Sequence, residues 1–230
     1  PGRTVADAAA DTRAVLDAYG HDRFVTLGWS GGGPHALACA ALLPDRCAAA
    51  ATLAGVAPYP ADGLDWLAGM GPENVVEFGA ATDGGAALTT YLEAEAAGLV
   101  GVTGDEVAQA LGGLVSDVDT ASLTGEFAAV VAEMFRRAVS TGIAGWRDDD
   151  LAFVRPWGFE LAGLGVPVAI WQGGQDRMVP YAHGTWLAGR IPGARAHLYP
   201  DEGHLSLVGQ LGRILDDLLD LAGGQLGSAT

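Results

Sequence analysis

The chain has 230 residues, and half of them are apolar, which is enough to bury the core of one full-sized domain. Twelve basic against 28 acidic residues leave a formal net charge of −16. A surface with this charge repels phosphate backbones and anionic lipid headgroups, so composition argues against a nucleic-acid or membrane-surface partner.

Three further features bear on the compartment. No apolar run reaches the roughly 18 to 20 residues that a bilayer span needs, and the N-terminal stretch "PGRTVADAAADTR" lacks the pattern of a signal peptide. The two cysteines, Cys39 and Cys47, are too few for a disulfide framework or a tetrahedral metal site, so we expect buried free thiols. We therefore expect a cytoplasmic protein, a monomer or a homodimer, whose partner is a small-molecule substrate.

The first sixty residues alternate between two hydrophobic periodicities. The pattern predicts a helix, a strand, a second helix and a second strand, over residues 4–19, 23–28, 33–43 and 48–56. Gly20 ends the first helix and Pro44 ends the second. The second strand is the weaker prediction, because "AAAATLAGV" is rich in alanine, a poor strand former.

The last part of the chain repeats this alternation. It predicts a strand, a helix, a strand and an amphipathic helix, over residues 166–174, 185–191, 194–200 and 205–222. Strands that alternate with helices are typical of a mostly parallel sheet flanked by helices. The fold class expected is therefore α/β.

Residues 60–164 lie between these two parts and carry no strand pattern. Segments such as "GEFAAVVAEMFRRAV" (125–139) have helical periodicity, and a structureless loop of this length is uncommon in a compact domain. We predict an inserted all-helical cap over residues 61–164, with residues 1–60 and 165–230 forming the α/β core.

The stretch "LGWSGGGPH" (27–35) places Ser30 between Gly28 and Gly32, where the first strand should end and a helix begin. On so sharp a turn the serine hydroxyl projects above the sheet edge, and the neighbouring backbones approach too closely for a Cβ, which predicts glycine at both flanking positions. The N–H of Gly31, at the positive end of the next helix, would point at an oxyanion formed on a substrate that Ser30 attacks.

A serine nucleophile needs a general base, and His204 is the best placed of the five histidines. It lies in "PDEGHLSL", on the turn after the last strand, at the edge of a parallel sheet where Ser30 emerges. The other four have ordinary structural interpretations, in a turn, on helices or inside a strand: His21, His35, His183 and His197.

Asp176 is predicted to be the acid, because its loop "WQGGQDRMVP" follows a strand and so lies at the same edge of the sheet. Asp148, Asp149 and Asp150 fit a solvated helix start better, and Asp201 and Glu202 fit a charged turn. The chain order is then Ser30, Asp176 and His204, which is the nucleophile–acid–base order associated with this type of turn.

At these residues the sequence resembles the α/β-hydrolase superfamily, in particular capped serine hydrolases of an actinobacterial type. The matching stretches are "VTLGWSGGGPHALACAALLPDR", "VPVAIWQGGQDRMVP" and "ARAHLYPDEGHLSL", with the cap phrase "GWRDDDLAFVRPW" also similar in type. The resemblance covers nearly the whole chain and implies the α/β-hydrolase fold, with neither a metal nor an organic cofactor.

The chain departs from the family in one respect. Family members carry several strands and a His-Gly oxyanion loop before the point that corresponds to Pro1, whereas "HG" occurs in this sequence only at His183-Gly184. Without those strands, "RFVTLG" becomes an exposed apolar edge strand, which natural sheets avoid. The resemblance thus leads us to expect a native polypeptide that is longer at its N-terminus, or a separate fragment that supplies the missing piece.

The predicted function is a serine hydrolase, an esterase that cleaves a small to medium apolar ester through an acyl-enzyme. Predicted substrate-binding residues are Trp29, Trp66, Phe135 and Trp157. Other aromatic and sulfur side chains of the cap can line the pocket or pack the cap's own core, namely Phe127, Met134, Trp146 and Phe153.

Three alternatives use the same three residues. An aminopeptidase or amidase would need acidic cap residues to recognise an amine, with Glu93, Glu95 and Glu133 as generic candidates. A cofactor-free perhydrolase is the second, and a non-catalytic small-ligand receptor that has retained the triad is the third. Reactions that need an aspartate nucleophile are disfavoured because position 30 is serine.

Overall fold

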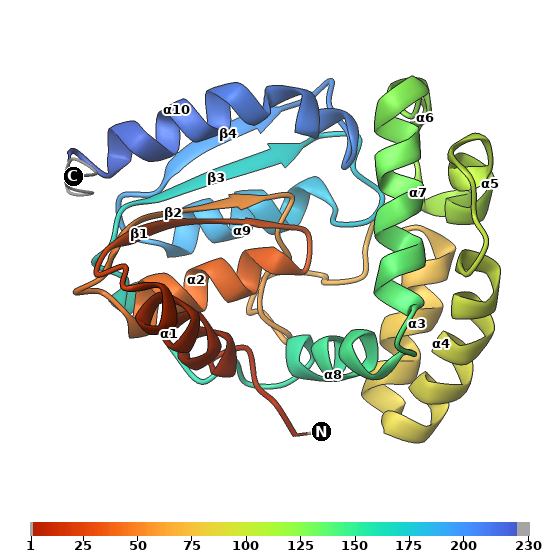
Figure 1. The fold of residues 1–230 in the computed structure, drawn as a ribbon, viewed down its shortest axis with the longest axis horizontal. Helices are drawn as coiled ribbons and strands as arrows, with labels where there is room; N and C mark the ends of the chain where they lie inside the picture. The colour runs from red at the N-terminus through yellow and green to blue at the C-terminus, as the bar shows by residue number, and fades with distance from the viewer. Residues whose placement is uncertain (1, 225–230) are drawn as a thin grey trace.

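A parallel sheet crosses the molecule. The computed structural model describes residues 2–224, and within them four strands lie in the order β1-β2-β3-β4, every pair parallel (Figure 1). The strands span Phe24–Trp29 (β1), Cys47–Leu53 (β2), Val168–Gly173 (β3) and Arg195–Tyr199 (β4). The expected α/β class with a parallel sheet is confirmed, and β1 lies at one edge of this sheet.

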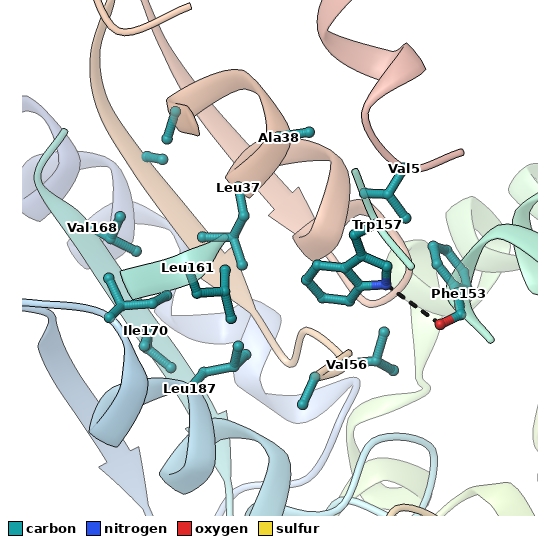
Figure 2. Close-up of a cluster of buried hydrophobic side chains, with 14 of the residues drawn as sticks. Val5, Leu37, Ala38, Val56, Phe153, Trp157, Leu161, Val168, Ile170 and Leu187 are labelled. Carbon is teal, nitrogen blue, oxygen red and sulfur yellow. Dashed lines mark hydrogen bonds between the residues drawn. The ribbon is translucent and has the colours of Figure 1, made fainter. Parts of the chain in front are cut away.

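Helices cover both faces of the sheet. Helices α2 (Gly32–Leu42) and α9 (Tyr181–Arg190) pack on one face, with α1 (Asp7–Tyr19) outside α2, and α10 (Leu211–Leu221) packs on the other (Figure 1). The alternation of β3 divides its side chains between two cores: Val168 and Ile170 join the α2/α9 side, whereas Trp171 joins the α10 side. Figure 2 shows the first of these clusters, where Leu37 and Leu187 face the two β3 residues.

The alanine-rich strand β2 is buried along its whole length. It pairs with β1 on one side and with β3 on the other, so it lies inside the sheet. Small side chains suit this place, because they let α2 and α10 pack closely on opposite faces of β2. Tertiary context thus outweighs the weak strand propensity of alanine.

Several predicted boundaries need correction. The first helix begins at Asp7 and not at residue 4, and α9 begins at Tyr181 and not at residue 185. The second strand ends at Leu53, before the predicted residue 56, because Ala54 adopts a left-handed conformation with φ 50°. The last helix, predicted over 205–222, is a 3-10 turn over Ser206–Gln210 followed by α10. Such differences of a few residues at element ends are usual, since the ends depend on caps and packing.

Within residues 54–167 the structure has helices and no strand, as predicted. They are α3 (Pro72–Asp83), α4 (Gly85–Leu99), α5 (Val107–Leu111), α6 (Asp117–Ser122), α7 (Gly125–Val139) and α8 (Ala144–Phe153), with short 3-10 turns at Gly104–Glu106, Gly112–Leu114 and Leu161–Gly163. The arrow of β3 points toward α6 and α7, so several of these helices lie beyond the carboxyl ends of the strands (Figure 1). The division into a core and a cap with boundaries at 60 and 165 stays a prediction.

None of the helices in the described part of the chain is both long enough and apolar enough to cross a bilayer.

Candidate functional site

Ser30 lies on a strained turn between β1 and α2. It has a left-handed backbone with φ 55°, which is rare for a residue that carries a Cβ. Its N–H donates to the carbonyl of Leu53 (2.8 Å) and its carbonyl accepts from Gly33 N–H (2.9 Å), so both sides of the turn are held. Strain of this kind persists where the surrounding structure enforces it, and it is frequent at functional sites.

The two glycines that flank Ser30 have different roles. A Cβ on Gly28 would lie 2.0 Å from the carbonyl oxygen of Gly32, whereas a Cβ on Gly32 would meet no atom of the described residues within 4 Å. The expectation that close approach requires glycine at both positions is therefore confirmed for Gly28 and wrong for Gly32. The backbone of Gly32 is the obstacle, and its own Cβ would point away.

Asp176 and His204 form a buried pair at the carboxyl ends of β3 and β4. Asp176 Oδ2 lies 2.8 Å from His204 Nδ1, and the two residues are 5% and 2% exposed. An ionised carboxylate only accepts hydrogen bonds, so Nδ1 carries the proton and Nε2 keeps its lone pair. The histidine is therefore in the tautomer that a general base requires.

The Asp176 carboxylate is itself fixed by its own loop. Oδ1 accepts from the N–H groups of Met178 and Val179, both at 2.8 Å, and Oδ2 also accepts from Gln172 Nε2 at 3.2 Å. The loops of the acid and the histidine are bonded to each other as well, through Gln175 N–H and the carbonyl of Glu202 (2.8 Å). These bonds set the position of the pair before any substrate binds.

Trp29 brings the histidine to the serine turn. Its ring stacks against the His204 ring with the centroids 5.7 Å apart, and Trp29 directly precedes Ser30 in the chain. The predicted nucleophile, acid and base are thus gathered at one edge of the sheet, on residues that follow β1, β3 and β4.

Asp119, on α6, is a site residue that the sequence analysis missed. It is fully buried, and its carboxylate accepts from three successive N–H groups of the histidine loop: His204 (3.1 Å), Leu205 (2.7 Å) and Ser206 (3.0 Å). A Cβ on Gly203 would lie 2.3 Å from its Oδ1, so the loop fits closely around the carboxylate. The capping-box pattern Ser116-x-x-Asp119 indicates a helix start but gives no sign of the contact 85 residues away.

A cavity of about 800 Å³ opens beside the serine turn. Ser30 and Gly31 line it, and most of its wall comes from the helices between β2 and β3. Gly31 is the N-cap of α2, and the first N–H groups of a helix have no acceptor within the helix, so its N–H is available to a ligand. Apolar side chains make much of the wall, including Val56, Phe78, Leu111, Phe135, Phe153 and Met178.

Comparison with known proteins identifies the family to which this fold belongs. The sequence model of the α/β hydrolase fold matches residues 2–209, which is most of the chain. The chain belongs to the α/β hydrolase fold family. No curated protein sequence matches it.

Solved structures of α/β hydrolases overlay nearly the whole chain. An α/β hydrolase fold protein from Nakamurella multipartita is 26% identical with a TM-score of 0.55, and the match covers 96% of this chain and 77% of that one. An esterase from Rhodococcus sp. ECU1013 is 21% identical with a TM-score of 0.57, covering 99% and 76%. A meta-cleavage product hydrolase from Pseudomonas fluorescens IP01 is 15% identical with a TM-score of 0.65, covering 98% and 74%. The likeness to the last two shows a common fold alone.

The structure separates the predicted substrate-binding residues of this α/β hydrolase. Phe135 lines the cavity, and Trp29 packs on His204. Trp66 and Trp157 lie in the hydrophobic core instead, 4% and 3% exposed. The indole of Trp66 donates to the carbonyl of Ala57 (2.7 Å), and that of Trp157 to the carbonyl of Phe153 (3.4 Å; Figure 2). Position in the chain alone could not separate core aromatic residues from cavity ones.

The four other histidines have the structural surroundings expected, except that His35 also lines the cavity. Burial lowers the pKa of His35, and Asp149 lies 3.7 Å from its Nε2. His183 is buried: its Nδ1 accepts from Ala57 N–H (3.1 Å), so its Nε2 donates to the carbonyl of Trp66 (2.9 Å). His197 stacks on Trp171 with the ring centroids 3.9 Å apart, and His21 is exposed.

The aspartates 148–150 do not form a solvated helix start. Helix α8 begins at Ala144 and ends at Phe153, so they lie in its middle turns, and Asp150 is only 4% exposed. Helical spacing puts Trp146, Asp150 and Phe153 on one face, and all three line the cavity. Of the acidic cap residues considered for amine recognition, Glu95 lines the cavity, Glu93 is exposed away from it, and Glu133 pairs with Arg136 and Arg137.

Proposed function

We propose that this protein is a serine hydrolase, an esterase that cleaves a small to medium, largely apolar ester through an acyl-enzyme on Ser30. The observation that carries the proposal is the buried Asp176–His204 hydrogen bond, with the histidine ring packed on the residue before Ser30. Pure ligand binding has little use for this arrangement, because it fixes a tautomer and leaves a basic nitrogen free.

In the proposed reaction Ser30 Oγ attacks the substrate carbonyl carbon and His204 Nε2 takes the hydroxyl proton. Asp176 holds the Nδ1–H and stabilises the imidazolium that forms. The Gly31 N–H donates to the oxyanion of the tetrahedral intermediate, and loss of such a donor typically lowers turnover about 10²–10³-fold.

Collapse of that intermediate breaks the ester bond, and His204 returns its proton to the departing alcohol. Water then attacks the acyl-enzyme with His204 again as the base, which releases the acid and restores the serine. We propose that the helices between β2 and β3 act as the cap that holds the apolar part of the substrate, with Phe135 and Phe153 on its wall.

A fluorophosphonate probe tests this proposal directly. We expect a single adduct that maps to Ser30, hydrolysis of p-nitrophenyl acetate and butyrate by the wild type, and loss of both in Ser30→Ala. Ser140→Ala, at an exposed serine after α7, is the matched control and should behave as the wild type.

The same assay separates the alternatives. Folded wild type that gains no adduct would favour a non-catalytic small-ligand receptor, and equal turnover by wild type and Ser30→Ala would reject the esterase. Turnover of an amide, or of an ester with hydrogen peroxide in place of water, would instead identify an aminopeptidase or amidase, or a perhydrolase, that uses the same residues.

A further inference from the structure

The part of the cavity wall that α3, α4 and α8 contribute carries several carboxylates. Among residues 2–224, five carboxylates line the cavity and no arginine does so: Glu73, Glu77, Glu95, Asp149 and Asp150. The formal charge of −16 makes acidic residues frequent on the surface, where water solvates them. It does not account for Glu77 and Asp150, which are buried at the wall of a largely apolar cavity, because burial opposes ionisation.

Two of these carboxylates face each other. Glu77 on α3 and Asp150 on α8 are 8% and 4% exposed, and their carboxyl groups lie within hydrogen-bonding range of each other. Such a contact is favourable only while the two groups share a proton. Trp146 Nε1 donates to Glu77 Oε1 at 2.7 Å and so orients that carboxyl.

Asp150 lacks the donors that a buried carboxylate normally has. Apart from the carboxyl group of Glu77, no side-chain or backbone group within residues 2–224 donates to its Oδ2, although buried polar atoms nearly always have such a partner. Burial raises the pKa of Asp150 well above its usual value, and Glu77 raises it further; burial also raises the pKa of Glu77. A bound cation with N–H donors would donate to the unpartnered oxygen of Asp150 and would also favour the ionised form of the two carboxyl groups.

We propose that Glu77 and Asp150 form an ammonium-binding subsite, and that the substrate combines an apolar body with a protonated amine. A primary ammonium group supplies three donors and one positive charge, which matches an unpartnered oxygen in a pair of crowded carboxylates. Aromatic rings of Trp146 and Tyr91, which line the same cavity, add favourable faces for a cation. In the described part of the chain no three acidic, histidine or cysteine side chains converge as a metal site would require, so the geometry favours an organic cation.

The assignment of this ligand as the substrate rests on the hydrolase function proposed above, whereas binding of the amine does not. The test therefore measures binding without turnover, by calorimetry with hexylammonium and with hexan-1-ol, which share one apolar chain. At pH 8 we expect the wild type to bind hexylammonium at least about tenfold more tightly than hexan-1-ol. Asp150→Asn and Glu77→Gln should reduce this ratio to about two or less, and Glu93→Gln, which removes an exposed charge outside the cavity, should keep it.

A measurement on the wild type alone guards against misfolded variants. Since the amine binds best to the ionised pair, its affinity should fall as the pH drops from 8 to 5 and the pair keeps a proton, and binding at intermediate pH should release protons to the buffer. Other titratable groups facing the pair are Tyr91 and Glu95 on α4, Asp149 on α8 and Glu73 on α3, with His35 on α2 beside Asp149. His35 would gain positive charge at low pH and lower the affinity further, so its contribution is checked with His35→Gln.

Equal affinity for hexylammonium and hexan-1-ol at pH 8 would overturn the proposal, and so would an unchanged ratio in folded Asp150→Asn. Each outcome is independent of the esterase assay, since a protein that binds the amine but turns over no ester would contradict the proposed function alone.

Discussion

Three buried aspartates of this protein fall into two groups, which differ in the hydrogen-bond donors around the carboxylate. At the carboxyl edge of the sheet, Asp176 and Asp119 accept hydrogen bonds from four and five donor groups, respectively, most of them backbone N–H groups. On the cavity wall, Asp150 is as deeply buried as Asp176, yet one of its oxygens has no donor in the described chain apart from the carboxyl group of Glu77. Burial alone therefore does not determine what a carboxylate does.

This contrast shows how the fold uses buried polar groups. Donors that already point at a carboxylate favour its charged form and make it a rigid support. A carboxylate without them is held at a disadvantage that a ligand can relieve. A carboxylate with its donors in place contributes to stability and to a fixed geometry. A carboxylate that lacks donors lowers stability but is available to a ligand.

The largest effect on activity is expected at Asp176, one of the two fully hydrogen-bonded aspartates. Asp176→Asn keeps the shape of the side chain but puts an amide where the His204 Nδ1–H needs an acceptor, so the wrong tautomer is favoured. We expect kcat for p-nitrophenyl acetate to fall by up to about 10⁴-fold with little change in KM. Asp201→Asn, on the exposed turn before His204, is the control. A fall below tenfold would show that Asp176 is not the acid.

Asp119 comes next. In Asp119→Asn only one oxygen remains for the N–H groups of residues 204–206, and the amide nitrogen is turned toward donors. We expect a loss of roughly 3–5 kcal/mol in the free energy of unfolding, together with a fall in kcat of about 10- to 100-fold.

The split between kcat and KM separates positioning from general damage in Asp119→Asn. Measured well below the melting temperature, KM should stay within about twofold, because the cavity wall is unchanged. Asp117→Asn, an exposed residue of the same helix, should match the wild type. If the folded Asp119→Asn protein keeps the wild-type kcat, Asp119 holds the fold but does not position His204.

His183 is a buried histidine whose two ring nitrogens are both hydrogen-bonded, and the pH dependence of protein stability tests its protonation state. Burial lowers its pKa to about 4, against about 6.5 in the unfolded chain. The unfolded state binds the proton more readily, so the stabilisation from neutral His183 is complete above pH 6.5 and is lost as the pH falls toward 4. The loss is about 3 kcal/mol.

Urea unfolding at pH 7.5 and pH 4.5 measures this loss. The difference in unfolding free energy between the wild type and His183→Gln should shrink by about 2.5 kcal/mol at the lower pH, whereas His21→Gln, at an exposed histidine, should show no such trend. A pH-independent difference would contradict the neutral, fully bonded state assigned to His183.

The smallest effect, of opposite sign, is expected at Asp150. Asp150→Asn removes a charge beside Glu77, so the protein should gain about 1 kcal/mol and about 3 °C in Tm at pH 8. Because the pKa of Asp150 is raised, the wild type is already protonated there at low pH, and the gain should disappear near pH 5. Thermal melting at the two pH values measures it, with Glu93→Gln as the control. Destabilisation at pH 8 would show that Asp150 is a satisfied structural group.

Sequence patterns were sufficient to predict the chain order of the elements and the place of Ser30, Asp176 and His204 at the ends of strands. Hydrophobic periodicity and turn residues are local signals, and a parallel sheet brings all its carboxyl ends to one edge. The same local signals supported the α/β class and the helical character of residues 60–164.

Contacts between side chains that are far apart in the sequence depend on how the helices pack, so sequence patterns did not predict them. The contact of Asp119 with the His204 loop joins residues 85 apart, and the Glu77–Asp150 contact joins α3 to α8. Neither is visible in periodicity, because the helices between β2 and β3 can pack in many ways with the same pattern. The core positions of Trp66 and Trp157 and the open space around Gly32 follow from the same cause. Burial and close approach are properties of packed neighbours, and a sequence pattern specifies those neighbours only where local geometry leaves no choice, as it does at Gly28.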